Sequence, residues 1–270
     1  MLFETVRVPA GQWSVEVTAY VPENWEEIDR NRTRPAVVLC PGGAYYMRSR
    51  REAEPVALQL MARDLCVFLL EYDVAPIRYP AAVTEAAAVV AHVRANAERY
   101  HVDPQRIAIM GFSAGGHLAG SLGVRWCQPW LSESLGLQPE DIRPNGMVLS
   151  YPVLTGGPFT HEYSMECLTG STDRALWAEQ SLEELVTEQT APAFLWHTFV
   201  DEVVPVENSL QFFAALRRHG IVSELHVYPY GGHGESLACD LTAGPDLTDD
   251  YRRPELVGWI DQACRWIRNL

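Results

Sequence analysis

The sequence contains no run of about 18 consecutive apolar residues, so no segment is expected to cross a membrane as a helix. Residues 1–7 also lack the basic stretch and the following apolar core that are typical of a signal peptide. These two absences predict a cytoplasmic protein that does not act at a membrane.

An excess of positive charge is also missing. The chain has 21 Lys and Arg residues against 35 Asp and Glu residues, which gives a net charge of −14 at pH 7. Because such a surface repels phosphate backbones and anionic lipids, we expect neither nucleic acid nor membrane as a partner. Neutral or weakly charged small molecules are favoured instead, and whether the protein is a homo-oligomer stays open.

Paired cysteines and metal-ligand spacings are absent as well. The six cysteines are scattered without a C-x-x-C pair, and several lie inside apolar runs. This pattern predicts buried free thiols rather than disulfides. No group of His, Cys and Asp residues has the spacing of a metal site, so we expect neither a metal nor another cofactor.

Strands alternate with helices along the chain, which predicts an α/β fold with a mostly parallel sheet. No repeat or linker interrupts this order, so residues 1–270 are expected to form one domain. The expected strands are 3–8, 13–21, 36–40, 67–72, the apolar run before Gly111, 147–151, 193–197 and 222–228. The expected helices are 55–64, 80–100, the segment after Ser113, 205–219 and 254–269.

Residues 152–190 form an exception, because no strand is evident there. We expect a loop over 155–171 and a helix over 173–188. This segment is therefore predicted to form a small cap over a site at the edge of the sheet.

Ser113 occupies the middle of a Gly-x-Ser-x-Gly pattern, between an apolar run and a helix of small residues. A serine in such a strand-to-helix turn is held above the sheet, and residues two positions away on either side must lack bulk for the backbones to approach. The pattern predicts that Ser113 is a nucleophile. A purely structural glycine-rich turn is the alternative.

A serine hydroxyl needs a neighbouring imidazole to accept its proton. His233 is the candidate base, because it follows the last strand in a glycine-rich loop. Asp201 follows the strand before and is the candidate partner of the imidazole, with Glu202 and Glu207 as fallback acids. The carboxyl ends of parallel strands meet at one edge of a sheet, so these residues are expected to lie together.

An acyl transfer through Ser113 also requires backbone N–H donors for the oxyanion. Ala114, the residue after the nucleophile, is expected to supply one. Gly43 or Ala44, in the glycine loop after the strand 36–40, is expected to supply the other. A plain turn in this loop is the alternative.

Other residues are weaker candidates. His117 lies one turn after Ser113 and is expected to pack beneath the turn rather than to react. Tyr45, His161 and Trp177 are candidate substrate-contacting residues, the last two from the predicted cap. Core packing is the alternative use of the tryptophan.

Four stretches carry a family resemblance: Pro41–Tyr45, Gly111–Ala119, His197–Pro205 and Gly232–Gly234. With the order Ser, Asp, His, the chain resembles the α/β-hydrolase superfamily over its whole length. More narrowly, it is similar to the small esterases related to bacterial acetyl esterases and acetylxylan esterases, in the BD-FAE-like or hormone-sensitive-lipase-like branch. The resemblance implies an eight-stranded sheet with helices on both faces and a small cap.

The resemblance also implies an esterase acting on short acyl groups, above all acetyl, with O-acetylated sugars or xylo-oligosaccharides as substrates. One departure is Pro41, which stands where lipases of this branch commonly carry a histidine at the start of the oxyanion loop. The alternatives are a peptidase or amidase on small substrates, a general carboxylesterase or lipase, and a non-catalytic small-molecule receptor.

Overall fold

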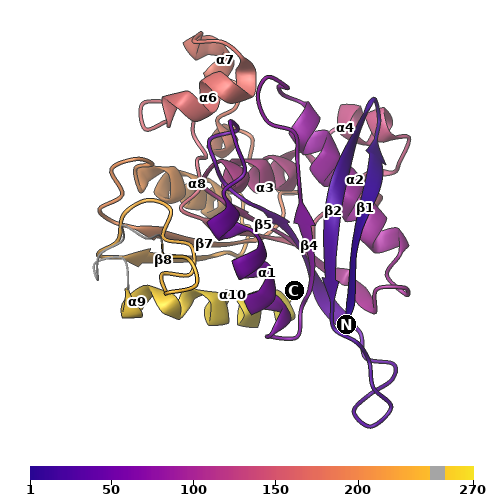
Figure 1. Ribbon diagram of the computed structural model, residues 1–270. Coiled ribbons are helices and arrows are strands. Elements are labelled where there is room, and N and C mark those ends of the chain that lie inside the picture. Colours follow the sequence, from indigo (N-terminus) through magenta and orange to yellow (C-terminus); the bar gives the residue numbers. More distant parts are fainter. Residues whose placement is uncertain (244–252) are drawn as a thin grey trace.

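The computed structural model describes residues 1–243 and 253–270 and is built around one eight-stranded sheet with the order β1-β2-β4-β3-β5-β6-β7-β8 (Figure 1). β1 and β2 form an antiparallel hairpin, β2 is antiparallel to β4, and the remaining pairs are parallel. The strands are β1 (Leu2–Ala10), β2 (Trp13–Val21), β3 (Arg34–Cys40), β4 (Cys66–Leu70), β5 (Val102–Phe112), β6 (Gly146–Ser150), β7 (Ala193–Thr198) and β8 (Glu224–Tyr228). The predicted α/β class and mostly parallel sheet are confirmed.

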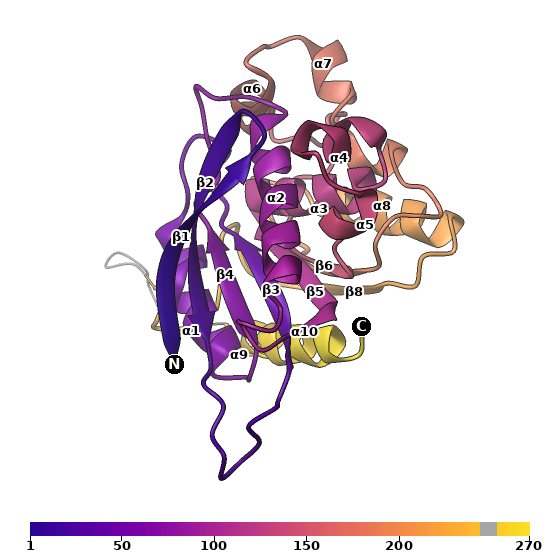
Figure 2. The ribbon, with the colours of Figure 1, turned by 90° about the vertical axis from the view of Figure 1, so that its right-hand side faces the viewer.

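Helices cover both faces of this sheet (Figure 2). They are η1 (Arg50–Glu52), α1 (Glu54–Met61), α2 (Ala81–Ala95), α3 (Ser113–Arg125), α4 (Pro129–Leu135), α5 (Pro139–Ile142), α6 (Glu162–Thr169), α7 (Arg174–Ala178), η2 (Leu182–Glu184), α8 (Glu207–Arg218), α9 (Pro254–Val257) and α10 (Trp259–Arg268). α2, α3 and α8 lie on one face, whereas α1 and α10 lie on the other.

Strand β3 shows why the central strands are apolar throughout. Val38 points into the core beneath α2 and α3, whereas Val37 and Leu39 point into the core beneath α1 and α10. Successive side chains of a strand alternate between the two faces, so a strand covered on both sides has no solvent-facing position. Each such Val or Leu side chain stabilises the fold by roughly 1.5–3 kcal/mol on burial.

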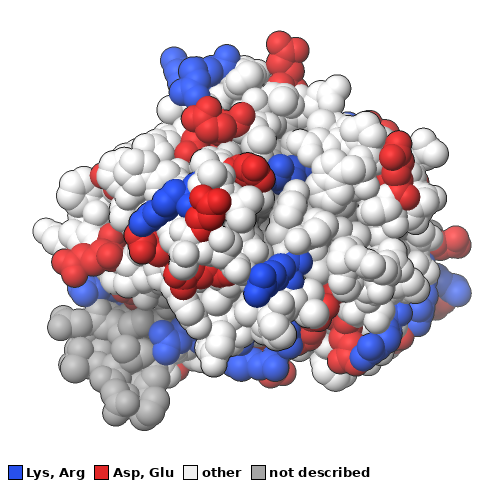
Figure 3. All heavy atoms as spheres, turned by 90° about the horizontal axis from the view of Figure 1, so that it is seen from above, with Lys and Arg blue, Asp and Glu red and all other residues white. Residues whose placement is uncertain are grey.

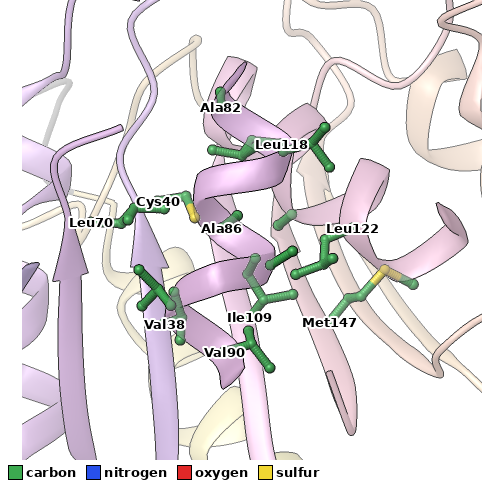
Figure 4. Close-up of a cluster of buried hydrophobic side chains, with 14 of the residues drawn as sticks. Val38, Cys40, Leu70, Ala82, Ala86, Val90, Ile109, Leu118, Leu122 and Met147 are labelled. Atoms are coloured by element: carbon green, nitrogen blue, oxygen red, sulfur yellow. The ribbon is translucent and has the colours of Figure 1, made fainter. Parts of the chain in front are cut away.

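The core between α2, α3 and the sheet is shown in Figure 4, where Ala82, Ala86 and Val90 of α2 face Leu118 and the strands. Alanine at positions 82 and 86 lets the helix approach the sheet closely. Burial is not limited to the face of α2 that meets the sheet, because nearly all of the helix is buried. The reason is that α4, α5 and β1 also contact it.

Three expected segments differ from the structure. The expected loop over 155–171 contains α6, whose Met165 and Leu168 face inward while its glutamates make its pattern look polar. The expected helix over 173–188 is divided into the short α7 and η2. The expected helix over 254–269 is interrupted at Gly258, which separates α9 from α10.

The cysteines were predicted to be free and buried, and the structure agrees fully with the first part and only partly with the second. All six are free; three of them are buried and the other three are half-buried, namely Cys127, Cys167 and Cys239. Among the described residues, no helix is both long and apolar enough to cross a membrane.

Candidate active site

Ser113 lies where β5 passes into α3 with no loop residue between them. Its φ of +52° is in the left-handed region, which costs a residue with a side chain roughly 1–2 kcal/mol. This sharp turn holds the hydroxyl at the carboxyl edge of the sheet, with the residue 8% exposed.

The two glycines of the pattern allow this turn to form. A Cβ on Gly111 would lie 1.9 Å from the carbonyl oxygen of Gly115, and a Cβ on Gly115 would lie 2.2 Å from the carbonyl oxygen of Cys40. Strand, helix and the neighbouring loop therefore touch backbone to backbone. Neither position has room for a side chain.

His233 lies in the loop after β8, between Gly231 (φ +124°) and Gly234 (φ +78°). Its Nε2 atom is 2.8 Å from Oγ of Ser113, although the two residues are 120 positions apart in the chain. The ring of Tyr151 meets the imidazole edge to face, with 5.1 Å between the ring centroids. The imidazole is thus held beside the hydroxyl in a position to accept its proton.

Asp201 follows β7 and its carboxylate is fully buried. Oδ2 accepts a hydrogen bond from Nδ1 of His233 at 2.7 Å, and Oδ1 accepts from the backbone N–H groups of Val203 and Val204. Burial alone would raise the pKa of Asp201, but the hydrogen bonds from His197 and His233 outweigh it and hold this pKa well below its usual range. The carboxylate therefore stays ionised at neutral pH.

His197 is a partner of this carboxylate that the sequence did not reveal, because its position in a strand suggested only packing. Its Nε2 atom lies 3.4 Å from Oδ2 of Asp201 and 2.9 Å from the carbonyl oxygen of Val204, and its Nδ1 atom lies 2.8 Å from Oγ of Ser209. The ring is completely buried. These contacts fix the turn that carries Asp201.

The glycine loop after β3 folds into a turn beside Ser113. Gly43 has a φ of +122° and Ala44 a φ of +57°, and a Cβ on Gly43 would lie 2.3 Å from the carbonyl oxygen of Met47. Within the described part of the chain, the N–H groups of these two residues have no hydrogen-bond partner. Ala114 is buried at the first turn of α3, where backbone N–H groups are also unpaired.

Glu52 is a second residue that no sequence pattern singled out. Its Oε2 atom accepts the N–H of Gly42 at 2.8 Å, and its Oε1 atom accepts the hydroxyl of Tyr151 at 2.7 Å. Tyr151 in turn accepts the N–H of Ser236 in the loop that carries His233. One buried carboxyl group thus connects the loop of Gly43 with the loop of His233.

We expect Glu52→Ala to lower kcat for a small ester by about 10- to 100-fold, because a misplaced loop weakens oxyanion binding. Burial raises the pKa of Glu52, and the hydrogen bonds from Tyr151 and Gly42 oppose this shift. Steady-state kinetics and thermal unfolding of the variant measure both effects. Glu54→Ala, at an exposed neighbouring position, is the matched control, and an unchanged kcat in a folded Glu52→Ala variant would contradict the role.

A cavity of about 630 Å³ opens over Ser113, which we call the nucleophile cavity. Its walls include Gly43, Ala44, Ser113, His161 and His233. His161 comes from the segment that was predicted to form a cap, and its Nδ1 atom lies 2.7 Å from Oγ of Ser164. Burial and the neighbouring His233 lower the pKa of His161, so its ring is neutral at pH 7.

The two other predicted substrate contacts, Tyr45 and Trp177, are not on the cavity wall. Tyr45 is 4% exposed, and its hydroxyl is 2.9 Å from Nδ1 of His117. Trp177 is 2% exposed and donates its indole N–H to the carbonyl oxygen of Ser171. Both rings serve packing, and the exposed aromatic residues beside Ser113 are instead Tyr46 and Tyr163.

His117 lies beneath the turn, as the sequence predicts. Its Nε2 atom is 3.0 Å from the carbonyl oxygen of Gln180, while Nδ1 faces Tyr45. The ring is buried, and burial lowers the pKa of His117 to about 4, with the nearby guanidinium of Arg125 adding to the shift. Tyr45 and Ser121, the other polar neighbours, keep their protons at neutral pH.

This buried imidazole predicts a loss of stability in acid. In the unfolded chain His117 takes up a proton near pH 6.5, whereas in the folded chain it does so only near pH 4. Between these values the unfolded state binds more protons, so the free energy of unfolding falls by up to about 1.4 kcal/mol per unit as pH is lowered. Urea unfolding of the wild type and of His117→Gln at pH 7 and 4.5 measures this, and an equal pH slope in both would contradict it.

Other kinds of site find no support in the described residues. Within them, no group of three or more His, Cys, Asp and Glu side chains is placed to hold a metal ion. The chain has no lysine, so a serine–lysine arrangement is not available to Ser113. What the structure shows instead is a serine hydroxyl within hydrogen-bond distance of an imidazole.

Two protein-family models match this chain. Residues 20–139 match the BD-FAE family model, and residues 144–242 match the prolyl oligopeptidase family model. The first match contains the glycine loop and Ser113, and the second contains Asp201 and His233. Both are families of α/β hydrolases.

Solved structures are similar to this chain over nearly its whole length. The acetyl ester-xyloside bifunctional hydrolase of Caldicellulosiruptor lactoaceticus is 33% identical, with a TM-score of 0.79 and coverage of 97% of this chain and 90% of that one. The carboxylesterase Cest-2923 of Lactobacillus plantarum is 30% identical, with a TM-score of 0.88 and coverage of 100% and 98%. The chain therefore belongs to the α/β-hydrolase superfamily. Within it, the chain belongs to the acetyl esterase-like group, as the sequence predicts.

A curated relative is longer than this chain. The endo-1,4-beta-xylanase B of Butyrivibrio fibrisolvens is 38% identical over 218 residues, which are 77% of this chain but 33% of that protein. The chain spans between a third and about half of the length of the first curated relatives it matches.

Proposed function

We propose that this protein is a serine esterase that hydrolyses short-chain carboxylic esters, acetyl esters above all, through an acyl-Ser113 intermediate. The observation that carries the proposal is the continuous hydrogen-bonded chain from Ser113 through His233 to Asp201, with distances of 2.8 and 2.7 Å, at the base of the nucleophile cavity. The relatives named as acetyl ester hydrolase and carboxylesterase support it.

The atoms fit the steps of acyl transfer. Oγ of Ser113 attacks the ester carbonyl while its proton passes to Nε2 of His233, and the Nδ1–H of the resulting imidazolium donates to Oδ2 of Asp201. The N–H groups of Ala114 and of Gly43 or Ala44 stabilise the oxyanion, each by about 3 kcal/mol. His233 then protonates the departing alcohol, and a water molecule activated by the same imidazole releases the acid.

The surroundings of Ser113 favour a short acyl group. Arg50 and Arg51 form part of the cavity wall, and a long alkyl chain that reached them would have to displace water from their guanidinium groups. For the alcohol part we propose an O-acetylated sugar, such as a xylo-oligosaccharide, in line with the names of the Butyrivibrio fibrisolvens and Caldicellulosiruptor lactoaceticus relatives. The face above the site suits a neutral substrate, because charges of both signs are scattered among wide uncharged areas (Figure 3).

The test is kcat/KM for p-nitrophenyl acetate, butyrate and octanoate, with an acetylated xylo-oligosaccharide in parallel. We expect acetate to exceed octanoate by about tenfold or more, because roughly 1.4 kcal/mol of lost binding is tenfold in rate. A preference for octanoate would instead make the protein a general carboxylesterase or lipase. A matched acetyl amide separates the amidase alternative, which the prolyl oligopeptidase match keeps open.

The organisation of the chain is part of the proposal. We treat residues 1–270 as one hydrolase domain, in which residues 152–190 form a cap. His161 and Tyr163 of this segment line the nucleophile cavity, which supports that role. The six free cysteines support a reducing compartment such as the cytoplasm.

A further inference from the structure

A second cavity, of about 780 Å³, adjoins the nucleophile cavity and has no part in the steps described above. We call it the distal cavity; its lining includes Ala75, Arg78, Glu166, Ser171 and Thr172. Tyr46 and Tyr163 line both cavities. A substrate that reaches from Ser113 into the distal cavity must therefore pass these two rings.

The two tyrosines are unusual in their exposure. Tyr46 is 60% exposed and Tyr163 is 46% exposed, and their ring centroids lie 5.9 Å apart with the planes tilted by 50°. Tyr46 belongs to the turn of Gly43, to whose carbonyl oxygen its N–H donates, and Tyr163 belongs to α6. Two large rings left open to solvent beside a nucleophile indicate a surface for a ligand.

Apolar and charged groups both line the distal cavity, and the charged groups decide which part of an ester fits it. Neither Arg78 nor Glu166 takes part in an ion pair within residues 1–243 and 253–270. An acyl chain would remove water from these charged groups without replacing its hydrogen bonds, which is costly. A hydroxylated ligand supplies such bonds, while its C–H faces pack on the electron-rich faces of aromatic rings.

From this arrangement we propose that the distal cavity is a subsite for a second sugar unit on the alcohol side of the ester, with Tyr46 and Tyr163 as its stacking platform. The inference rests on the proposed esterase function and narrows its substrate class to acetylated oligosaccharides rather than acetylated monosaccharides. Both cavities fall in the size range of small-molecule binding sites.

The experiment compares kcat/KM for an acetylated xylotriose, an acetylated xylose and p-nitrophenyl acetate in the wild type, Tyr163→Ala and Tyr163→Phe. We expect the ratio of the trisaccharide value to the p-nitrophenyl acetate value to fall about tenfold in Tyr163→Ala, mainly through KM, because a stacking contact is lost. The ratio is expected to recover in Tyr163→Phe, which keeps the ring. Trp25→Ala, at an exposed tryptophan that lines neither cavity, is the matched control.

Two outcomes would overturn the subsite. One is equal kcat/KM for acetylated xylose and xylotriose in the wild type; the other is a Tyr163→Ala ratio equal to that of Trp25→Ala. If either result is found while p-nitrophenyl acetate is still hydrolysed, the proposed esterase function stands and only the subsite is rejected. Absence of hydrolysis of all three esters by folded wild-type protein would instead contradict the proposed function itself.

Discussion

Ser113→Ala is expected to lower kcat for p-nitrophenyl acetate by roughly 10⁴- to 10⁶-fold, since the alanine has no oxygen to form the acyl intermediate. The methyl group occupies less space than the hydroxymethyl group, and the left-handed turn is unchanged, so the variant should fold. Burst kinetics and steady-state rates, together with circular dichroism and the unfolding temperature, measure the effect.

The control for this variant lies on the same helix. Ser121 is also buried in α3, and among the described residues its hydroxyl has only a long contact of 3.5 Å with His117. Ser121→Ala should therefore keep wild-type activity to within a few-fold. If Ser113→Ala hydrolysed the ester at the rate of Ser121→Ala, the nucleophile would have to be sought elsewhere.

Asp201→Asn should be the next most damaging change, with kcat about 10⁴-fold lower and KM little altered. An amide at this position cannot stabilise the imidazolium of His233, and it can turn the ring to the wrong tautomer. Steady-state kinetics with p-nitrophenyl acetate, together with the unfolding temperature of the variant, measure the loss.

The fallback acids provide the comparison for Asp201. Glu202 is exposed and Glu207 is half-buried at the start of α8, and the carboxylate that accepts the hydrogen bond from Nδ1 of His233 is that of Asp201. Glu202→Gln and Glu207→Gln should thus each retain nearly full activity. A larger loss in either variant than in Asp201→Asn would reassign the acid.

The residues that could be predicted from the sequence share one property. The residues next to them in the sequence explain where they lie in the fold. Ser113 is flanked by glycines that a strand-to-helix turn requires, and Asp201 and His233 each follow a strand that the sequence predicts. The chain order of parallel strands then brings them to one edge of the sheet. The mostly parallel sheet was predictable for the same reason, because both-face burial makes its strands continuous apolar runs.

The residues that the sequence did not reveal owe their positions to contacts between distant segments of the chain. Glu52 reads as one more acid in a charged stretch, and its importance comes from Tyr151, which is 99 positions away. Tyr163 lies on a helix whose polar composition resembles that of a loop. Trp177 illustrates the reverse error, because a large aromatic residue in a cap suggests ligand contact while the fold buries its ring.

The separation of Ser113 and His233 by 120 positions also bears on how the protein folds. Contacts between remote segments form late, since closing a long loop costs entropy before any contact compensates for it. The loop of His233 follows β8, and Trp259 of α10 holds it by donating its indole N–H to the carbonyl oxygen of Ser236. During refolding, helical signal should therefore return before hydrolytic activity, and activity reports that the last segments of the chain have docked.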